Sequence, residues 1–144
     1  WVSCLLYNKY RIVTKKERAR MKLNKIHHIA MIVSDYEKSK KFYTEQLGFQ
    51  ILRENYRENR GDYKLDLKQG DCELEIFSGK GHPERPSYPE ACGLRHLAFH
   101  VEDIGETIKE LNEAGIEDIR RDTFTGKKMT FFHDPDGLPL ELHE

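Results

Sequence analysis

Two stretches of this chain place a histidine and a glutamate at closely matching positions. His28 opens the stretch HIAMIVSD and His96 opens HLAFHVED, so that an aspartate falls seven residues after each histidine. Further along each copy a glutamate lies inside an apolar run, Glu75 in the first and Glu141 in the second. Two imidazoles and two carboxylates suit a divalent cation such as Zn, Ni, Co, Mn or Fe. The sequence therefore predicts two copies of one module that together supply a metal site.

Because side chains alternate along a strand, each of these four residues is expected on the strand face opposite an apolar one. Residues of equal parity share a face, and the face opposite each ligand is apolar. Opposite His28 and Glu141, for example, lie Ile29, Met31, Val33, Leu138, Leu140 and Leu142. Taken singly, each of these residues is more typical of the polar face of a half-solvated sheet than of a metal ligand. The matching positions in two copies favour the metal site, because stacking of the modules would bring the four side chains together.

A helix with a defined beginning and end is expected after each histidine strand. Asp35 and Asp103 are the expected N-caps, and Glu106 would complete a capping box with Asp103. Gly48 and Gly115 are expected to end the two helices; Glu75 lies 27 residues after the first glycine, and Glu141 lies 26 after the second. Three strands should follow each helix, near residues 49–54, 62–68, 71–77, 116–121, 128–132 and 138–143.

Length and composition bound the organisation of the chain. The 144 residues have room for one domain with a proper core. In the first twenty residues the apolar part precedes the basic part, the reverse of a secretory signal peptide. We expect these residues to be a non-native or disordered extension upstream of a natural start at Met21, the alternative being a genuine extra strand or arm. The expected divisions are the extension 1–20 and one domain 21–144, with module one at 24–78, a linker at 79–93 and module two at 94–144.

Charge, hydropathy and cysteine usage exclude several function classes. The formal net charge is −1 and the mean hydropathy is −0.77, and no apolar run approaches the roughly 20 residues that span a bilayer. We therefore expect neither a nucleic-acid partner nor a membrane partner. Cys4, Cys72 and Cys92 show neither paired nor metal-binding spacing, which favours a reducing cytoplasm.

Other polar segments are candidates for substrate contacts. The charged run 53–60 is typical of a solvated hairpin loop, although it could also line a substrate entrance. Lys127 lies in a loop, 125–128, that could fold over an anionic substrate. His100 and His143 share the faces of their neighbouring ligands, and each either helps to orient a ligand or is a coincidental surface histidine. His27 has the wrong parity for a ligand.

With the repeat, the four ligands and the turn DPDG at 134–137 before Glu141, the chain resembles the vicinal oxygen chelate superfamily over about residues 24–144. It is most similar to the small glyoxalase I-like members. The resemblance implies an α+β fold in which two tandem β-α-β-β-β modules form a cupped mixed sheet around one divalent metal. His28, Glu75, His96 and Glu141 each fall where the family places a ligand. It also implies a homodimer, because in many relatives modules of two chains complete the site.

The same resemblance implies a lyase or isomerase that acts on a small carbonyl substrate through an enediolate. The metal would stabilise the enediolate, and a carboxylate would move the proton between adjacent carbons. Glu141 is the first choice for this base and Glu75 the second. Bacterial glyoxalase I has an Arg and an Asn that help to hold glutathione, where this chain has Ile32 and Gly79. The standard use of glutathione is therefore not expected.

Other members of the superfamily supply the competing functions. A methylmalonyl-CoA epimerase would use the same enolate stabilisation. A fosfomycin-type thiol transferase needs three metal ligands, so a fourth at Glu75 speaks against it, and extradiol dioxygenases usually have longer chains. A metal-free drug-binding module of the same fold would be expected to have lost ligand positions, whereas all four are present here.

Overall fold

The computed structural model describes residues 22–117, 119–122 and 129–144. The expected extension 1–20 and the loop 125–128 with Lys127 lie outside the described residues. The first module contains β1 (Ile29–Val33), α1 (Tyr36–Lys41), the π-helical turn η1 (Phe42–Gln46), β2 (Gln50–Arg57), β3 (Asp62–Gln69) and β4 (Cys72–Ser78). The second contains β5 (Leu97–His100), α2 (Ile104–Glu113), β6 (Arg120–Asp122), β7 (Met129–His133) and β8 (Pro139–His143).

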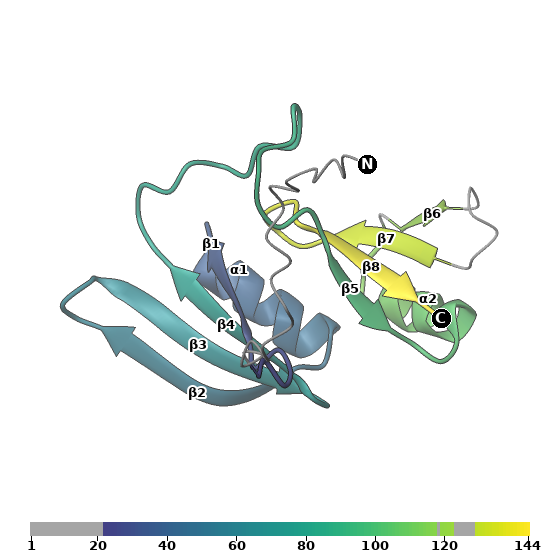
Figure 1. The fold of residues 1–144 in the computed structure, drawn as a ribbon, viewed down its shortest axis with the longest axis horizontal. Helices are drawn as coiled ribbons and strands as arrows, with labels where there is room; N and C mark the ends of the chain where they lie inside the picture. The colour runs from purple at the N-terminus through teal and green to yellow at the C-terminus, as the bar shows by residue number, and fades with distance from the viewer. Residues whose placement is uncertain (1–21, 118, 123–128) are drawn as a thin grey trace, which may run out of the picture.

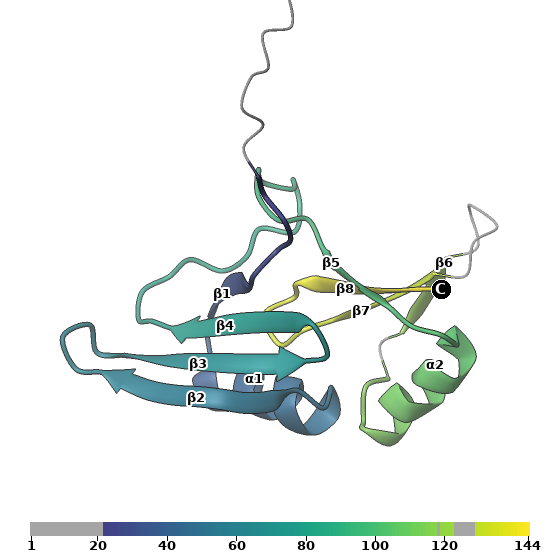
Figure 2. The ribbon, with the colours of Figure 1, turned by 60° about the horizontal axis from the view of Figure 1, so that its bottom comes forward.

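The two modules have the same topology, as the repeat predicts. The strand order is β1-β4-β3-β2 in the first sheet and β5-β8-β7-β6 in the second. In each sheet the first pair of strands is parallel and the other pairs are antiparallel. Figure 1 shows the sheets side by side, and Figure 2 shows each helix against one face of its own sheet. The α+β fold with two tandem β-α-β-β-β modules is confirmed.

The helix boundaries follow the expected capping chemistry. The Asp35 carboxylate accepts a hydrogen bond from the Lys38 backbone N–H at 3.0 Å, and the Asp103 carboxylate accepts one from the Glu106 N–H at 2.9 Å. Gly48 lies just after the first helical segment with φ +77°, a left-handed conformation that favours glycine. The first helix is α-helical for only six residues and closes with the π-helical turn η1.

The hydrophobic core lies between each sheet and its helix. The strand faces that the sequence predicts to be apolar are buried or half-buried, and Leu74, Ile76 and Leu140 have no exposed surface. The helix stripe of Ile108 and Leu111 is buried as well. The opposite face of each sheet is left uncovered by its own helix, so the ligand faces remain available for chemistry.

Polar contacts join the two modules. The Tyr43 hydroxyl, which is fully buried, donates to the Asp134 carboxylate at 2.9 Å, and Ser34 bonds to the Asp136 carboxylate. Asp134 also accepts from the Leu138 N–H at 2.8 Å inside the turn 134–137. Burial raises the pKa of both Tyr43 and Asp134. The predicted turn therefore both closes the β7–β8 hairpin and connects module two to module one.

Two expectations about local structure are wrong. Most of the charged segment 53–60 belongs to strand β2 rather than to a hairpin loop, and the turn lies at 58–61. β2 is an edge strand whose residues are all exposed or half-buried, so it lacks the apolar alternation by which a strand is recognised. The predicted ligands His28 and His96 also lie one residue before β1 and β5 rather than inside them.

Candidate metal centre

The first half of the predicted site lies at the beginning of β1 and in the middle of β4. These strands run parallel, and Ala30 is next to Glu75 in register. His28 lies two residues before Ala30 and therefore on the same face of the sheet. The His28 Nε2 atom is 3.6 Å from Glu75 Oε2. Both side chains keep some exposed surface, 41% for His28 and 22% for Glu75. The small Ala30 leaves the space above the carboxylate open.

The second module reproduces this arrangement with parallel strands β5 and β8. Ala98 is next to Glu141 in register, and His96 Nε2 lies 3.0 Å from Glu141 Oε2. The Glu141 side chain is only 9% exposed, so it is the more buried of the two carboxylates. Each module therefore brings one predicted histidine to one predicted glutamate.

The structure does not bring the two pairs together within one chain. Among the residues that it describes, no group of three or more His, Cys, Asp or Glu side chains lies close enough to hold a metal ion. His28 with Glu75 and His96 with Glu141 are thus two separate half-sites.

Each half-site nevertheless has the spacing of two ligands on one ion. Nitrogen and oxygen ligands lie about 2.1 Å from a metal such as zinc, which places them about 3.0 Å apart at right angles and about 3.4 Å apart at a tetrahedral angle. The observed separations are 3.0 Å and 3.6 Å. Imidazole nitrogen and carboxylate oxygen also suit the same group of divalent ions. The residues present therefore fit a divalent metal, which they would hold through both histidines and both glutamates.

The surroundings of Glu75 are strongly charged. Lys64 on β3 donates to Glu75 Oε1 at 2.6 Å and lies 3.0 Å from the Asp66 carboxylate, whose other oxygen accepts from Arg53 at 2.8 Å. Glu75 and Asp66 raise the pKa of Lys64. Although burial opposes the effect, Lys64 and Arg53 hold the pKa of Asp66 below its usual range. These side chains form a network across three strands on the ligand face.

Sequence reasoning missed Lys64 and Asp66, although a signal for them exists. They alternate along β3 with the buried Leu65 and Leu67, which places both on the ligand face. Their contact with Glu75 depends on the register of β3 against β4, which pairs Asp66 with Glu75. That register is a property of the fold and cannot be read from residue spacing alone.

The other histidines have distinct surroundings. His27 Nδ1 lies 2.9 Å from Nδ1 of His28, so His27 adjoins the first half-site without being one of the predicted ligands. His100 is exposed and pairs in register with His143 on the ligand face of module two. The predicted role of His100 in binding substrate stays a prediction.

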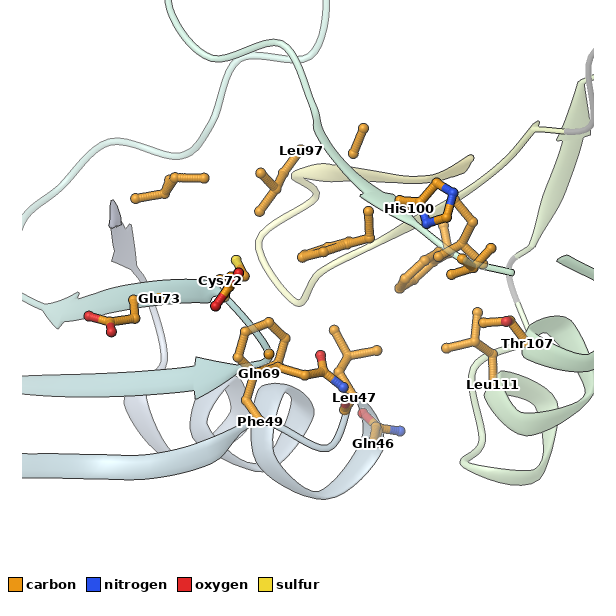
Figure 3. A pocket seen from close by; sticks show the side chains of 18 of the residues that line it. Gln46, Leu47, Phe49, Gln69, Cys72, Glu73, Leu97, His100, Thr107 and Leu111 are labelled. Carbon is orange, nitrogen blue, oxygen red and sulfur yellow. Dashed lines mark hydrogen bonds between the residues drawn. The ribbon is translucent and has the colours of Figure 1, made fainter. Parts of the chain in front are cut away.

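A cavity of about 700 Å³ lies between the modules but does not include the four predicted ligands. Its lining comes from the β3–β4 turn, the end of η1, strand β5 and helix α2, and Figure 3 shows Cys72 and Glu73 across from Thr107 and Leu111. Burial raises the pKa of the Cys72 thiol. His27 and His100 border this space next to the half-sites. The four predicted ligands therefore lie outside this cavity, on the sheet faces that the helices leave uncovered.

The repeated topology and the paired half-sites define a member of the vicinal oxygen chelate class, and comparison with known proteins agrees. Residues 25–142 match the model of the Glyoxalase/Bleomycin resistance protein/Dioxygenase superfamily, so the chain belongs to that superfamily. Members of this superfamily include many enzymes, and glyoxalase I and FosX among them bind divalent metals.

Three individual proteins illustrate the similarity. The protein YwkD of Bacillus subtilis is 58% identical, over 86% of this chain and 99% of its own length. The crystal structure of a glyoxalase family protein from Enterococcus faecalis superposes with a TM-score of 0.78 at 63% identity, covering 86% of this chain and all of that one. A probable lactoylglutathione lyase of Vibrio parahaemolyticus is 35% identical over 85% of this chain and 91% of its own.

No helix among the described residues is both long enough and apolar enough to cross a membrane.

Proposed function

We propose that the protein is a metal-dependent lyase or isomerase of the glyoxalase type, which moves a proton between adjacent carbons of a small carbonyl substrate through an enediolate. The observation that carries the proposal is the duplicated half-site, in which a histidine nitrogen and a glutamate oxygen lie 3.0 Å and 3.6 Å apart. In this proposal His28 and Glu75 of one chain and His96 and Glu141 of a second chain form one centre. The working molecule is then a homodimer, and fold relatives commonly form dimers.

Within this site the side chains have separate tasks. The bound divalent ion, one of Ni, Zn, Co, Mn or Fe, would supply the positive charge that polarises a substrate carbonyl. Glu141 is the proposed base, because its carboxylate is the more buried and because His96 beside it can orient it. Glu75 is the second candidate; its Oε1 is occupied by Lys64, which would have to release it for proton transfer.

The identity of the substrate is constrained by two residues that depart from glutathione-dependent glyoxalase I. Ile32 is 59% exposed on the ligand face, at the position where bacterial glyoxalase I has an arginine. Gly79 follows β4, at the position where bacterial glyoxalase I has an asparagine. Neither can hold the charged ends of glutathione. We therefore propose a substrate other than the standard glutathione adduct. Free thiols at Cys72 and Cys92 support the further proposal of a reducing cytoplasm.

The decisive test is the metal content of the purified full chain, measured by elemental mass spectrometry after reconstitution with each of the five metals. We expect about one ion per pair of half-sites in the wild type. His28→Ala and Glu75→Ala should each lower the retained metal by about tenfold or more, because each removes one of four ligands.

His82→Ala is the matched control, since His82 is an exposed histidine in the linker. It should retain the full metal content. If the wild type holds no ion with any of the five metals, the enzyme proposal fails and a binding module of the same fold takes its place.

A further inference from the structure

The two half-sites repeat the ligands but not the residues that surround them. Across the sheet from Glu75, β3 places Asp66 in register, and across from Glu141, β7 places Phe131 at the equivalent position. Two residues earlier on each strand, Lys64 on β3 corresponds to Met129 on β7. The His96 ring packs edge-on against Phe131 at 5.8 Å between centroids. One half-site therefore has a charged wall and the other an aromatic one.

The charged wall contains a cation whose charge metal binding would leave unbalanced. On the ligand face of the first sheet, four cations each lie against at least one carboxylate: Arg53 with Asp66, Arg57 with Asp62, Lys68 with Glu73, and Lys64 with both Asp66 and Glu75. If Glu75 becomes a metal ligand, its negative charge is neutralised there. Lys64 and Arg53 then share the single carboxylate of Asp66, which leaves one unit of positive charge beside the centre.

The position of Lys64 suits it to contact a bound substrate rather than solvent. Its side chain is 24% exposed, so most of its stem is covered, and the ammonium lies 5.7 Å from the centre of the Phe77 ring. Phe77 pairs in register with Ile32, so an apolar strip adjoins the cation on the same face. A partly desolvated ammonium binds a carboxylate more tightly than an exposed one does.

We propose that Lys64 binds a carboxylate of the substrate beside the metal centre, so that the enzyme acts on an anionic oxo- or hydroxy-acyl compound rather than on a neutral one. This inference rests on the proposed function. It makes Lys64 a specificity-determining residue, and it predicts that the substrate carries its negative charge a few bonds from the carbonyl oxygen that faces the metal.

Two small chelators separate this role from a merely structural one. Acetohydroxamate is a chelator with two vicinal oxygens, and succinomonohydroxamate adds one carboxylate to the same group. Their dissociation constants are measured by calorimetry on the Mn²⁺-loaded full chain, together with the metal content of each variant. We expect the wild type to bind the carboxylated chelator about tenfold more tightly, the gain typical of a charge-assisted hydrogen bond.

The variants assign that preference to one side chain. Lys64→Gln should lose the preference while it keeps its metal and its affinity for acetohydroxamate, and Lys64→Arg should retain the preference. Lys68→Gln, four residues along the same strand and face, is the matched control and should behave as the wild type does.

Equal affinities of the wild type for both chelators, or an unchanged preference in Lys64→Gln, would overturn the proposal and leave the proposed function intact. Loss of metal from Lys64→Gln would also overturn it, because Lys64 would then act by holding Glu75. If no variant and no wild-type chain holds metal or either chelator, the proposed function fails and this inference fails with it.

Discussion

A single carboxylate, Glu54, connects helix α1 to strand β2. It accepts a hydrogen bond from the Tyr36 hydroxyl at 2.6 Å, and the Lys40 ammonium lies 2.8 Å from both of its oxygens. Lys40 and Tyr36 lower the pKa of Glu54 from its ordinary value of 4.5. Tyr36 also stacks on Tyr63 of β3 at 4.4 Å between centroids, so this contact joins charge pairing to aromatic packing.

The lowered pKa of Glu54 predicts a pH-dependent contribution to stability. Because the folded value lies below the unfolded one, the contribution is complete above about pH 4.5 and is lost as the pH falls through the lowered value. Glu54→Gln should reduce the free energy of unfolding by about 0.5–1 kcal/mol at pH 7, as for other partly exposed ion pairs, and by less at pH 3. Urea unfolding at the two pH values measures the difference.

Glu58→Gln is the control for that experiment, since it removes a carboxylate of the same chain segment from the exposed turn after β2. An equal loss at both pH values in Glu54→Gln would show that packing, and not the charge of Glu54, stabilises this contact.

At the scale of elements, the N-caps define where the helices begin. Asp35 accepts from the third residue of its helix, which satisfies one of the N–H groups that a helix leaves unpaired. Asp35→Ala should lower the free energy of unfolding by about 1 kcal/mol, whereas Asp35→Asn, which keeps an acceptor oxygen, should lower it by a few tenths. Urea denaturation at one fixed protein concentration checks both. Equal losses in the two variants would mean that the negative charge, and not the cap, matters at this position.

Helices and strands with an apolar side could be predicted because their periodicity reflects burial. Leu74 and Ile76 alternate with Glu73 and Glu75, and the structure buries the first pair and leaves the second pair partly exposed on the other face. β2 could not be recognised in this way. Its charged residues pair with neighbours on both faces, Glu54 toward the helix and Arg53 toward the ligand face, and this pairing is invisible without the register of β3.

At the scale of the whole molecule, the repeat predicts the module but not the relation of one module to the other. The spacing of one histidine and one glutamate identifies a half-site, as for His28 and Glu75, since the two residues lie at neighbouring strands of one sheet. The relation between modules depends on contacts such as Tyr43 with Asp134, which join residues 91 positions apart. The two half-sites are separate among the described residues of one chain, so the proposed four-ligand centre calls for an assembly of two chains.

This arrangement predicts that two chains, each lacking the two metal ligands of a different module, can together restore one metal centre. One chain carries His28→Ala with Glu75→Ala, and the other carries His96→Ala with Glu141→Gln. If each centre combines module one of one chain with module two of its partner, a mixed dimer contains one intact centre and one that lacks all four ligands. After the chains are unfolded, mixed equally and refolded, half of the dimers are mixed, and the retained metal per chain should recover to about one quarter of the wild-type value.

Each variant refolded alone supplies the baseline, and elemental mass spectrometry measures all three samples. Recovery requires that ligands cross between chains, because neither chain contains an intact set. A mixture that stays at the baseline would place all four ligands of a centre in one chain and contradict the shared site.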